Sequence, residues 1–365
     1  MKLTPVEPSR ARIGLCMIVK NEAAVIERCL QSVLPMIDTW LIVDTGSTDA
    51  TCDIINSTLK DVPGALHARP WQDFAHNRSE AIELARASCD YLLFIDADEV
   101  LVLPNAFALP ELLADAYSAT IMHNSMRYAR TCLVSTQRAW RYCGVLHEYL
   151  ECERPYTVER INGFNVLYTP DGARSRNPRK YHDDAAVLEA ALLQEPGNLR
   201  YMFYLAQSWR DAGEPEKALA AYQRRAALSG WDEEDWYAQY QVARLMESTS
   251  QAENETINAY LKAYEARPSR AESLMWLGIY LYRRGRWANA KAMLSIAVKI
   301  PFTQDKLFIE NDCYVWRRYD ELALSFFYQG AKDQAKRLWE VLLRTGRIPK
   351  EQIDRIHANI QFCAE

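Results

Sequence analysis

A short apolar run, residues 91–94, leads directly into Asp96-Ala97-Asp98-Glu99. The run has the composition of a buried strand, and residues two apart in an extended segment point to the same side. Asp96 and Asp98 are therefore expected to converge on one ligand at the strand's carboxyl end, where open α/β sheets place ligands. Carboxylate oxygens suit Mg²⁺ or Mn²⁺. Asp is also common where strands end, so an ordinary turn is the simpler alternative for this pair alone.

Two further strand patterns precede this motif. Residues 13–19 are continuously apolar and are followed by Lys20-Asn21-Glu22 and a helical pattern. Residues 40–43 form a second buried run, which ends in Asp44 and leads into Gly46-Ser47-Thr48-Asp49. Gly46 permits a positive φ or a close backbone approach. The three polar residues after it are good N-caps, and the amides of the following helix would also suit a phosphate; capping alone is the alternative.

Four blocks of the sequence together resemble family 2 glycosyltransferases of the GT-A fold, in both order and spacing. The blocks are Met17-Ile18-Val19-Lys20-Asn21-Glu22, Val43-Asp44-Thr45-Gly46-Ser47-Thr48-Asp49, Phe74-Ala75-His76-Asn77-Arg78 and Phe94-Ile95-Asp96-Ala97-Asp98-Glu99. In that family the first two blocks hold the nucleotide of a sugar donor, the third lies near its base and phosphates, and the Asp-x-Asp motif binds ribose and a divalent metal.

The resemblance assigns expected roles to individual residues. Glu22 and Asp44 would contact uridine, and Asp96 would bind ribose and lie at the metal with Asp98. The expected donor-binding set is Val19, Glu22, Asp44, Asn77, Arg78 and Asp96.

The resemblance continues on the acceptor side. Trp140-Arg141-Tyr142 is followed by Gly144-Val145-Leu146-His147-Glu148, and many family members carry a His-Glu or similar acidic pair here. Inverting transfer needs a carboxylate to take the acceptor's proton, so Glu148 is the candidate base. His147 is a second candidate catalytic residue and a possible metal or phosphate contact. A surface carboxylate and a structural histidine are the alternatives.

One position departs from the family pattern. Related enzymes often carry a histidine that completes the metal shell before an Asp-Gly turn, but Tyr168 and Thr169 stand here before Asp171-Gly172. Water, His147 or Asp171 would then complete the shell, with His182 as a further candidate.

From about Asp183 onward, helical periodicity replaces the strand patterns. Pairs of a large and a small residue recur at Leu205, Val242, Leu277 and Leu322, which are 37, 35 and 45 residues apart. Tetratricopeptide repeats recur at about 34 residues, so we expect an irregular array with longer connections. Its aromatic positions resemble a helical extension seen behind some bacterial family 2 transferases. Acceptor recognition or self-association is the expected role, and a structural lid or dimerisation element is the alternative. These positions are Tyr201, Phe203, Tyr204, Trp209, Trp231, Trp236, Tyr237 and Tyr240.

Composition points to a cytoplasmic enzyme. The 365 residues are 49% hydrophobic, enough for two cores, and no apolar stretch is long enough for a transmembrane helix or a signal peptide. The nine cysteines are scattered, which favours reduced thiols over disulfides or zinc. A net charge of −5 gives no general nucleic-acid signature.

The sequence therefore predicts an α/β GT-A (Rossmann-like) nucleotide-sugar-binding domain at residues 1–182 and an all-α tetratricopeptide-like solenoid at 183–365. The expected activity is metal-dependent, inverting transfer from a nucleotide-sugar, UDP-linked, with Mn²⁺ or Mg²⁺ as cofactor. The acceptor is a hydroxyl or thiol of a macromolecule, peptide or protein in the favoured case, with glycan or modified nucleic acid left open, and the helical domain offers a route to a homo-oligomer. One alternative is a non-catalytic tetratricopeptide scaffold. Another is a nucleotidyltransferase, although residues 18–22 lack the glycine-rich phosphate loop expected of one.

Overall fold

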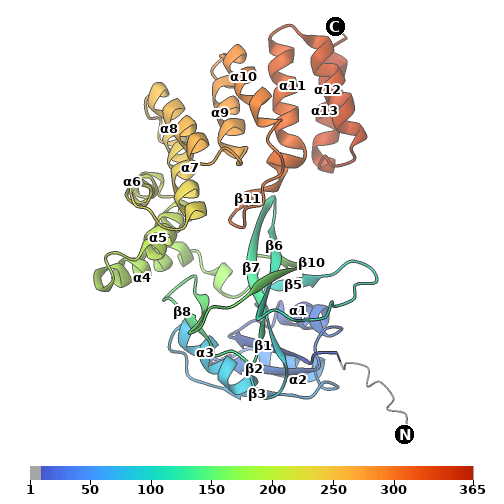
Figure 1. The fold of residues 1–365 in the computed structure, drawn as a ribbon, viewed down its shortest axis with the longest axis vertical. Helices are drawn as coiled ribbons and strands as arrows, with labels where there is room; N and C mark the ends of the chain where they lie inside the picture. Colours follow the sequence, from blue (N-terminus) through green and yellow to red (C-terminus); the bar gives the residue numbers. More distant parts are fainter. Residues whose placement is uncertain (1–9, 365) are drawn as a thin grey trace. The chain divides into compact units, whose positions relative to one another are not determined.

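The structure is a computed structural model that describes residues 10–364 and divides into two compact units (Figure 1). The first unit extends to Gln194, apart from Ser125–Arg127, which group with Glu195 onward because Met126 and Arg127 pair with Glu310 and Ile309. The expected boundary at residue 182 lies inside helix α4 (Lys180–Gln194), which belongs with the first unit.

The first unit is built on one sheet whose strand order is β3-β2-β1-β4-β7-β6-β10-β5. The first four strands are parallel, and β4 pairs antiparallel with β7. At the other end β10 runs parallel to β6 and antiparallel to β5. The strands are β1 (Ile13–Val19), β2 (Thr39–Asp44), β3 (Gly64–Ala68), β4 (Tyr91–Phe94), β5 (Glu99–Val102), β6 (Ala116–His123), β7 (Met126–Ser135) and β10 (Val158–Tyr168).

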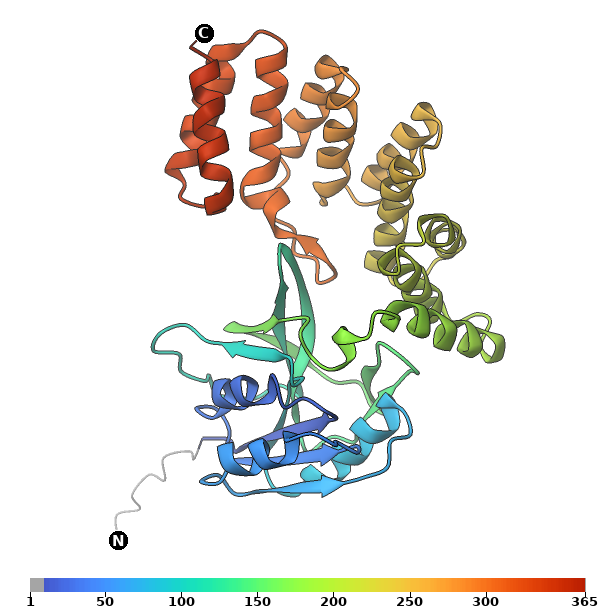
Figure 2. The same ribbon diagram turned by 180° about the vertical axis from the view of Figure 1, so that it is seen from behind.

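Helices cover both faces of this sheet because its central strands are apolar on both sides. Helices α1 and α2 cover one face of the sheet and α3 the other (Figure 2). Alternate residues of β1, such as Ile13, Leu15 and Met17, pack with α1 and α2, whereas Cys16 packs with α3. This period of two is the side-chain alternation of a strand. A separate two-stranded sheet lies beside α3. The elements are α1 (Ile26–Val33), α2 (Thr51–Thr58), α3 (Phe74–Ala85), β8 (Trp140–Cys143), β9 (Tyr149–Cys152) and the short η1 (Arg174–Arg176).

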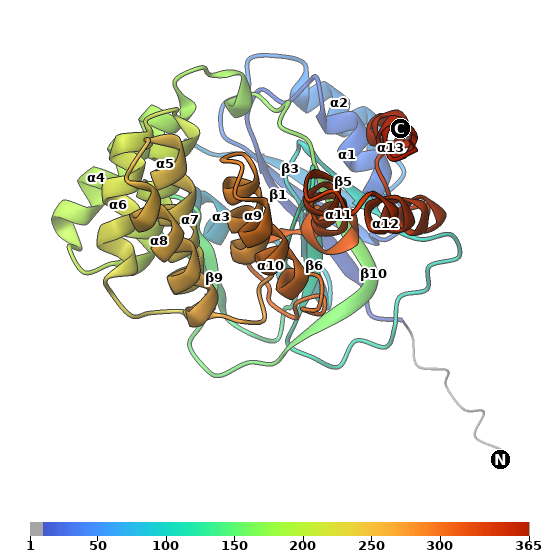
Figure 3. The same ribbon diagram turned by 90° about the horizontal axis from the view of Figure 1, so that it is seen from above.

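The second unit is helical, with pairs that follow one another in chain order (Figure 3). No helix within residues 10–364 is long and apolar enough to cross a membrane. The elements of the second unit are α5 (Leu199–Asp211), α6 (Pro215–Ala226), α7 (Asp232–Ser248), α8 (Glu253–Ala266), α9 (Glu272–Tyr282), α10 (Trp287–Ala297), β11 (Ile309–Glu310), η2 (Cys313–Arg317), α11 (Arg318–Tyr328), α12 (Lys332–Arg344) and α13 (Lys350–Phe362).

The predicted repeat is confirmed, since each large-small pair lies on the first helix of a hairpin. Gly278 illustrates why the second position is small. A Cβ at Gly278 would lie 2.5 Å from Cγ of Leu294 on α10, closer than any real contact. The spacing of 45 residues reflects a long connection between α10 and α11, which contains β11.

This α10–α11 connection packs against the aromatic side chains singled out in the sequence. Phe308 stacks on Phe203, with ring centroids 6.4 Å apart, and contacts Tyr237 at 5.0 Å. Glu310 accepts a hydrogen bond from Tyr240 and one of 2.8 Å from Trp276. Three of the eight positions, Phe203, Tyr237 and Tyr240, thus contact the chain's own segment.

Candidate active site

The carboxyl ends of β1, β2 and β4 lie at one edge of the sheet, as predicted for the sequence motifs. Val19, the last residue of β1, pairs with Asp44, the last residue of β2, and Cys16 pairs with Phe94, two residues before Asp96. After β1 the chain forms β2 and β3 on one side of β1 in the sheet, and it then forms β4 on the other side of β1. This is the topological switch point at which open α/β sheets bind ligands.

Asp44 organises the loop after β2. Its carboxylate accepts hydrogen bonds from the backbone amides of Gly46 at 3.2 Å and Ser47 at 3.1 Å, and Gly46 has a φ of 103°. Val19 accepts a 2.9 Å bond from the Thr45 amide through its carbonyl. The β1 and β2 ends are therefore fixed to each other through backbone groups, and Val19 itself offers only its carbonyl, since its side chain is buried.

Glu22 reaches across to the segment after β10. Its carboxylate accepts a 3.0 Å hydrogen bond from the Ala173 amide, and its own amide donates to Thr51 at 2.8 Å. Burial raises the pKa of Glu22, and the bond from Ala173 partly offsets this effect. The bond from Ala173 holds the Glu22 carboxylate at the same end of the sheet as Asp44.

The turn after β4 displays Asp96 and Asp98 and anchors Glu99. The Glu99 carboxylate is buried and accepts a 3.0 Å bond from the Asp96 amide, while the Glu99 amide donates to the Asp96 carbonyl at 3.0 Å. The Asp98 carbonyl accepts bonds from Thr169, at 3.1 Å from its amide and 2.7 Å from its hydroxyl. The turn is fixed on both sides, so the two carboxylates have defined positions.

Arg78 on α3 connects Asp96, after β4, with Glu148, before β9. Its Nη2 donates to Asp96 Oδ1 at 2.6 Å, and its Nε lies 2.6 Å from Glu148 Oε1 in an ion pair that lacks hydrogen-bond alignment. The side chains of Arg78 and Glu148 are 14% and 13% exposed, against 36% for Asp96. The two predicted site residues Asp96 and Glu148 are thus joined through one guanidinium.

A second arginine, Arg130, was not identified as a site residue from the sequence. It extends a row of alternating charges that runs through Glu148, Arg78, Asp96, Arg130 and Glu99. Arg130 on β7 binds both oxygens of Glu99, at 2.8 and 2.5 Å, and its Nη1 lies 3.7 Å from Asp96 Oδ2. Burial raises the pKa of Asp96, but Arg78 and Arg130 lower it by more, so the pKa lies below the ordinary value. Asp96 is therefore a stable carboxylate.

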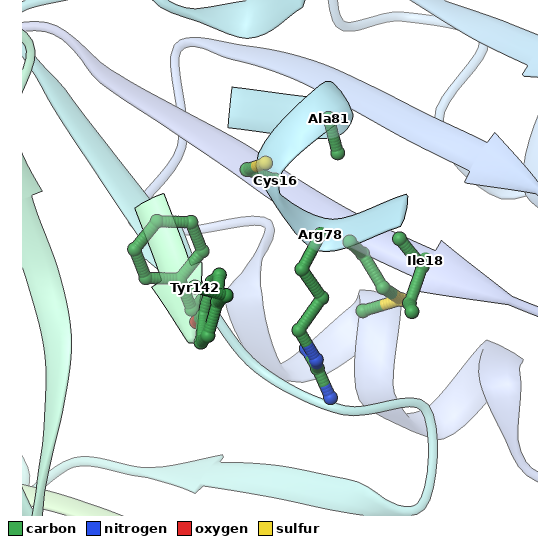
Figure 4. Close-up of a pocket in the computed structure, with 7 residues that line it drawn as sticks. Cys16, Ile18, Arg78, Ala81 and Tyr142 are labelled. Atoms are coloured by element: carbon green, nitrogen blue, oxygen red, sulfur yellow. The ribbon is translucent and has the colours of Figure 1, made fainter. Parts of the chain in front are cut away.

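Side chains of β1, α3 and β8 lie around the stem of Arg78 (Figure 4). The guanidinium carbon lies 5.5 Å from the centre of the Tyr142 ring on β8, and Cys16 and Ile18 of β1 are among these side chains. Tyr142 belongs to the Trp140-Arg141-Tyr142 block that the sequence resemblance included. The structure shows that this block supports the arginine that contacts Asp96.

Asn77 is fully buried, and its side chain bonds to the loop before α3. Its side chain accepts a 3.0 Å bond from the Gln72 amide and donates 3.1 Å to the Pro70 carbonyl. The structure thus gives Asn77 a loop-holding role before α3, and its contact with a donor stays a prediction.

The three candidates for completing the metal shell have different surroundings. Asp171 binds Arg28 with both oxygens, at 2.7 and 2.5 Å, and Arg28 also contacts Thr169. His147 is exposed and has a left-handed backbone with φ of 51°. His182 is half-buried in the first turn of α4. Their part in metal binding stays a prediction.

The charges around Asp98 fit a cation. Among residues 10–364 no three His, Cys, Asp or Glu side chains form a ready-made metal cluster, and Asp98 has no salt bridge to any described residue. Burial, together with the charges of Asp96 and Glu99, raises the pKa of Asp98 to about 7. Gly172 adjoins this carboxylate so closely that a Cβ would lie 2.9 Å from Asp98 Oδ2. Mg²⁺ and Mn²⁺ usually take one or two carboxylates and complete their shell with water and substrate phosphates, which Asp98 would suit.

Two family models match the chain. Residues 15–118 match Glycosyl transferase family 2, and residues 179–234 and 255–301 match Tetratricopeptide repeat. The chain joins a family 2 glycosyltransferase domain to tetratricopeptide repeats. The transferase match covers the ends of β1, β2 and β4 and therefore includes Glu22, Asp44, Arg78, Asp96 and Asp98.

Curated relatives match parts of the chain. The chain is 36% identical over 220 residues to the SPbeta prophage-derived glycosyltransferase SunS of Bacillus subtilis, over 56% of this chain and 50% of that protein. It is 41% identical over 93 residues to a TPR repeat-containing protein of Synechococcus elongatus, over 26% of this chain and 22% of that protein. It is 35% identical over 99 residues to the lipopolysaccharide core biosynthesis glycosyltransferase LpsC of Rhizobium meliloti, over 27% of this chain and 36% of that protein. The chain spans half or less of the length of these three relatives.

Proposed function

We propose that the first unit transfers a sugar from a nucleotide-sugar, UDP-linked, to a hydroxyl or thiol of a macromolecular acceptor, with inversion at the anomeric carbon. The observation that carries this proposal is the convergence of Asp44, Asp96, Asp98 and Arg78 at the switch point of a family 2 glycosyltransferase domain. Glycosyl transfer is supported by the family match, and the donor, the metal and the stereochemistry are our inference.

The donor is proposed to lie along the carboxyl ends of β1, β2 and β4. Asp44 and Glu22 face the base and Asp96 the ribose, because these carboxylates accept hydrogen bonds from N–H and O–H groups. The Asp96 carboxylate is more exposed than its arginine partner and stays ionised at neutral pH. It can therefore bind a hydroxyl without a change of protonation.

Asp98 is proposed to hold Mg²⁺ or Mn²⁺ together with the donor's diphosphate. A bound cation would neutralise the charge that develops on the departing diphosphate. Asp98 faces the negative charges of Asp96, Glu99 and Glu22, an arrangement that favours a cation. Arg78 and Arg130 add fixed positive charge at the same edge.

Glu148 is proposed as the base. It accepts the proton of the acceptor hydroxyl while that oxygen attacks the anomeric carbon, and the bond from that carbon to the phosphate oxygen breaks with its electron pair. The ion pair with Arg78 holds the carboxylate in place. A donor phosphate competes for the same guanidinium. Binding of the donor therefore frees the Glu148 carboxylate from its ion pair with Arg78.

A peptide or protein acceptor is the class we favour, because tetratricopeptide repeats stack into surfaces that bind extended partners. The chain's own α10–α11 connection already covers Phe203 and Tyr237. An acceptor would therefore use the remainder of that surface.

The direct test is to incubate the full chain with Mn²⁺ and a panel of nucleotide-sugars and to measure released nucleotide. We expect slow, metal-dependent hydrolysis of one UDP-sugar, and its loss in Asp98→Asn. Asp53→Asn on α2 is the matched control and should keep the activity. Failure of every donor, with and without metal, would contradict the proposal.

A further inference from the structure

The loop between β3 and α3 displays an indole at the same edge of the sheet as the candidate active site. The side chain of Trp71 is 42% exposed. Among the described residues of the loops that follow β1, β2, β3 and β4, no other large hydrophobic side chain is exposed to this extent. Strand β3 is parallel to β2, so this loop leaves the sheet at the carboxyl end, where open α/β sheets bind ligands.

Buried groups hold this loop in place on both sides of Trp71. The fully buried Asn77 side chain donates a 3.1 Å bond to the Pro70 carbonyl and accepts a 3.0 Å bond from the Gln72 amide. The Trp71 ring lies against Phe74, with centroids 4.7 Å apart and an angle of 80° between the two planes. Trp71 is therefore preorganised, because its backbone and its ring are positioned before a ligand arrives.

The same loop begins beside Asp44. Ala68, the last residue of β3, pairs with Asp44, the last residue of β2, and the Arg69 amide donates a 2.9 Å bond to the Asp44 carbonyl. Trp71 follows two residues later. Because the strand order is β3-β2-β1-β4, Trp71 lies at the Asp44 end of the site, and Asp96, which follows β4, lies at the opposite end.

A second series of contacts connects the loop to Glu22. The Ala173 amide donates a 3.0 Å bond to the Glu22 carboxylate. The next residue is Arg174, whose guanidinium carbon lies 4.8 Å from the centre of the Phe74 ring. Phe74 in turn contacts Trp71. The indole is thus connected by short contacts to both carboxylates that are proposed to face the base of the donor.

Hydrogen bonds to carboxylates can hold the edge of a nucleobase, but they leave its two faces uncovered, and aromatic side chains bind such faces by stacking. The segment after β1, residues 20–25, contains no aromatic residue that could do so. We propose that Trp71 stacks on the nucleobase of the sugar donor, an inference that rests on the proposed function. Every nucleobase has a π face, so Trp71 contributes affinity and orientation, whereas Asp44 and Glu22 would select the nucleobase.

The position of Trp71 favours the nucleobase over the acceptor as its ligand. Glu148, the proposed catalytic base, contacts Arg78, which also bonds to Asp96. The acceptor is therefore expected at the Asp96 end of the site, whereas Trp71 lies at the Asp44 end.

Calorimetric titration of the full chain with Mn²⁺ tests this proposal, with UDP, GDP and ADP as probes. We expect the native protein to bind UDP and Trp71→Leu to weaken that binding about 10- to 100-fold, the loss expected of one stacked nucleobase. Trp71→Phe should keep most of the affinity, because a phenyl ring also stacks. Trp231→Leu, at an indole of the helical unit that is 43% exposed, is the matched control and should bind UDP normally.

Saturation-transfer NMR with Mg²⁺ gives a second measurement, which does not depend on the affinity. In the native protein the uracil ring protons of UDP should receive strong saturation. In Trp71→Leu their saturation relative to that of the ribose protons should fall, because the protons of the indole no longer lie against the uracil. An unchanged ratio would overturn the proposal.

Two calorimetric results would overturn the proposal and leave the proposed function intact. The first is equal UDP affinity in the native protein and Trp71→Leu; a fall in transfer alone would then assign Trp71 to the acceptor. The second is equal weakening in Trp71→Phe and Trp71→Leu, which would attribute the loss to packing of the loop.

The nucleotide panel separates these results from a failure of the proposed function. Native protein that binds none of the three nucleotides would contradict the proposed donor and the stacking inference with it. Binding of GDP or ADP in place of UDP would overturn only the uridine assignment, and Trp71→Leu should then weaken that nucleotide by the same factor.

Discussion

Arg130 offers the sharpest structural prediction, because it neutralises a carboxylate that has almost no access to water. The side chain of Glu99 is 1% exposed, and both its oxygens bind Arg130. Arg130→Met would keep the stem and remove the charge. Breaking a buried ion pair from one side destabilises a protein by about 3–5 kcal/mol, so we expect that loss in the first unit.

A double variant tests whether the loss of stability in Arg130→Met comes from the unpaired charge of Glu99. Glu99→Gln together with Arg130→Met leaves no unpaired charge, and Gln still accepts the Asp96 amide bond. The double variant should therefore lose less stability than Arg130→Met alone, by about 2 kcal/mol or more. Arg86→Met, which breaks the exposed pair with Glu83, is the matched control at about 0–1 kcal/mol.

Hydrogen–deuterium exchange followed by mass spectrometry measures the loss of stability of the first unit in each variant. Peptides of the helical unit provide an internal reference. We expect exchange in β1, β4 and β7 to accelerate roughly 10² to 10⁴-fold in Arg130→Met, with α5–α13 unchanged. Unchanged strand exchange in Arg130→Met, or a double variant as unstable as the single one, would refute the reasoning.

Three further outcomes follow from the structure. Glu148→Gln should keep donor binding while transfer to a hydroxyl acceptor falls by a factor on the order of 10² to 10⁴; near-normal turnover would move the base elsewhere, with Asp171 next to test. Gly172→Ala places a methyl 2.9 Å from Asp98 Oδ2 and should weaken metal-dependent UDP binding about 10- to 100-fold in calorimetry, whereas Gly197→Ala, in open space, should not. Burial and Asp320 raise the pKa of Glu321 from 4.5 to about 7. The native state therefore binds more protons than the unfolded state in that window, and stability falls as pH rises through it. Urea unfolding of Glu321→Gln should show a gain of at most about 3 kcal/mol above that window and none below it; an equal gain at both pH values would exclude titration as the cause.

The sequence predicted those parts of the site that depend on local pattern. Asp44 and Asp96 follow apolar runs that could only be buried strands, and parallel pairing then brings their ends together. The repeat positions Leu205 and Leu277 likewise follow from helix packing, which requires small residues at fixed intervals. Both inferences rest on local patterns, an apolar run before polar residues and a helical repeat, which a single sequence displays directly.

The remaining features arise from contacts between residues far apart in the chain. Arg130 lies in β7, a strand with no motif, and it binds Glu99, the first residue of β5, which lies 31 positions earlier in the chain. The ion pair of Arg78 with Glu148 joins positions 70 residues apart. Neither pairing leaves a periodic signal.

The same limit applies to the helical unit. The packing of Phe308 on Phe203 joins α5 to a connection about a hundred residues later. Sequence reasoning assigned the aromatic positions to acceptor recognition or self-association, with a structural lid or dimerisation element as the alternative. It had no means of detecting that the chain's own α10–α11 connection lies against three of them.

The most direct test of the central claim is a calorimetric titration of UDP into the protein with and without Mn²⁺. We expect metal-dependent binding in the native chain and its loss in Asp98→Ala, with the fold preserved because Asp98 lies at the edge of the sheet. Circular dichroism confirms the fold of the variant. Metal-dependent UDP binding that is equal in Asp98→Ala and the native protein would remove Asp98 from the site, and the absence of UDP binding in the native protein would contradict a UDP-sugar donor.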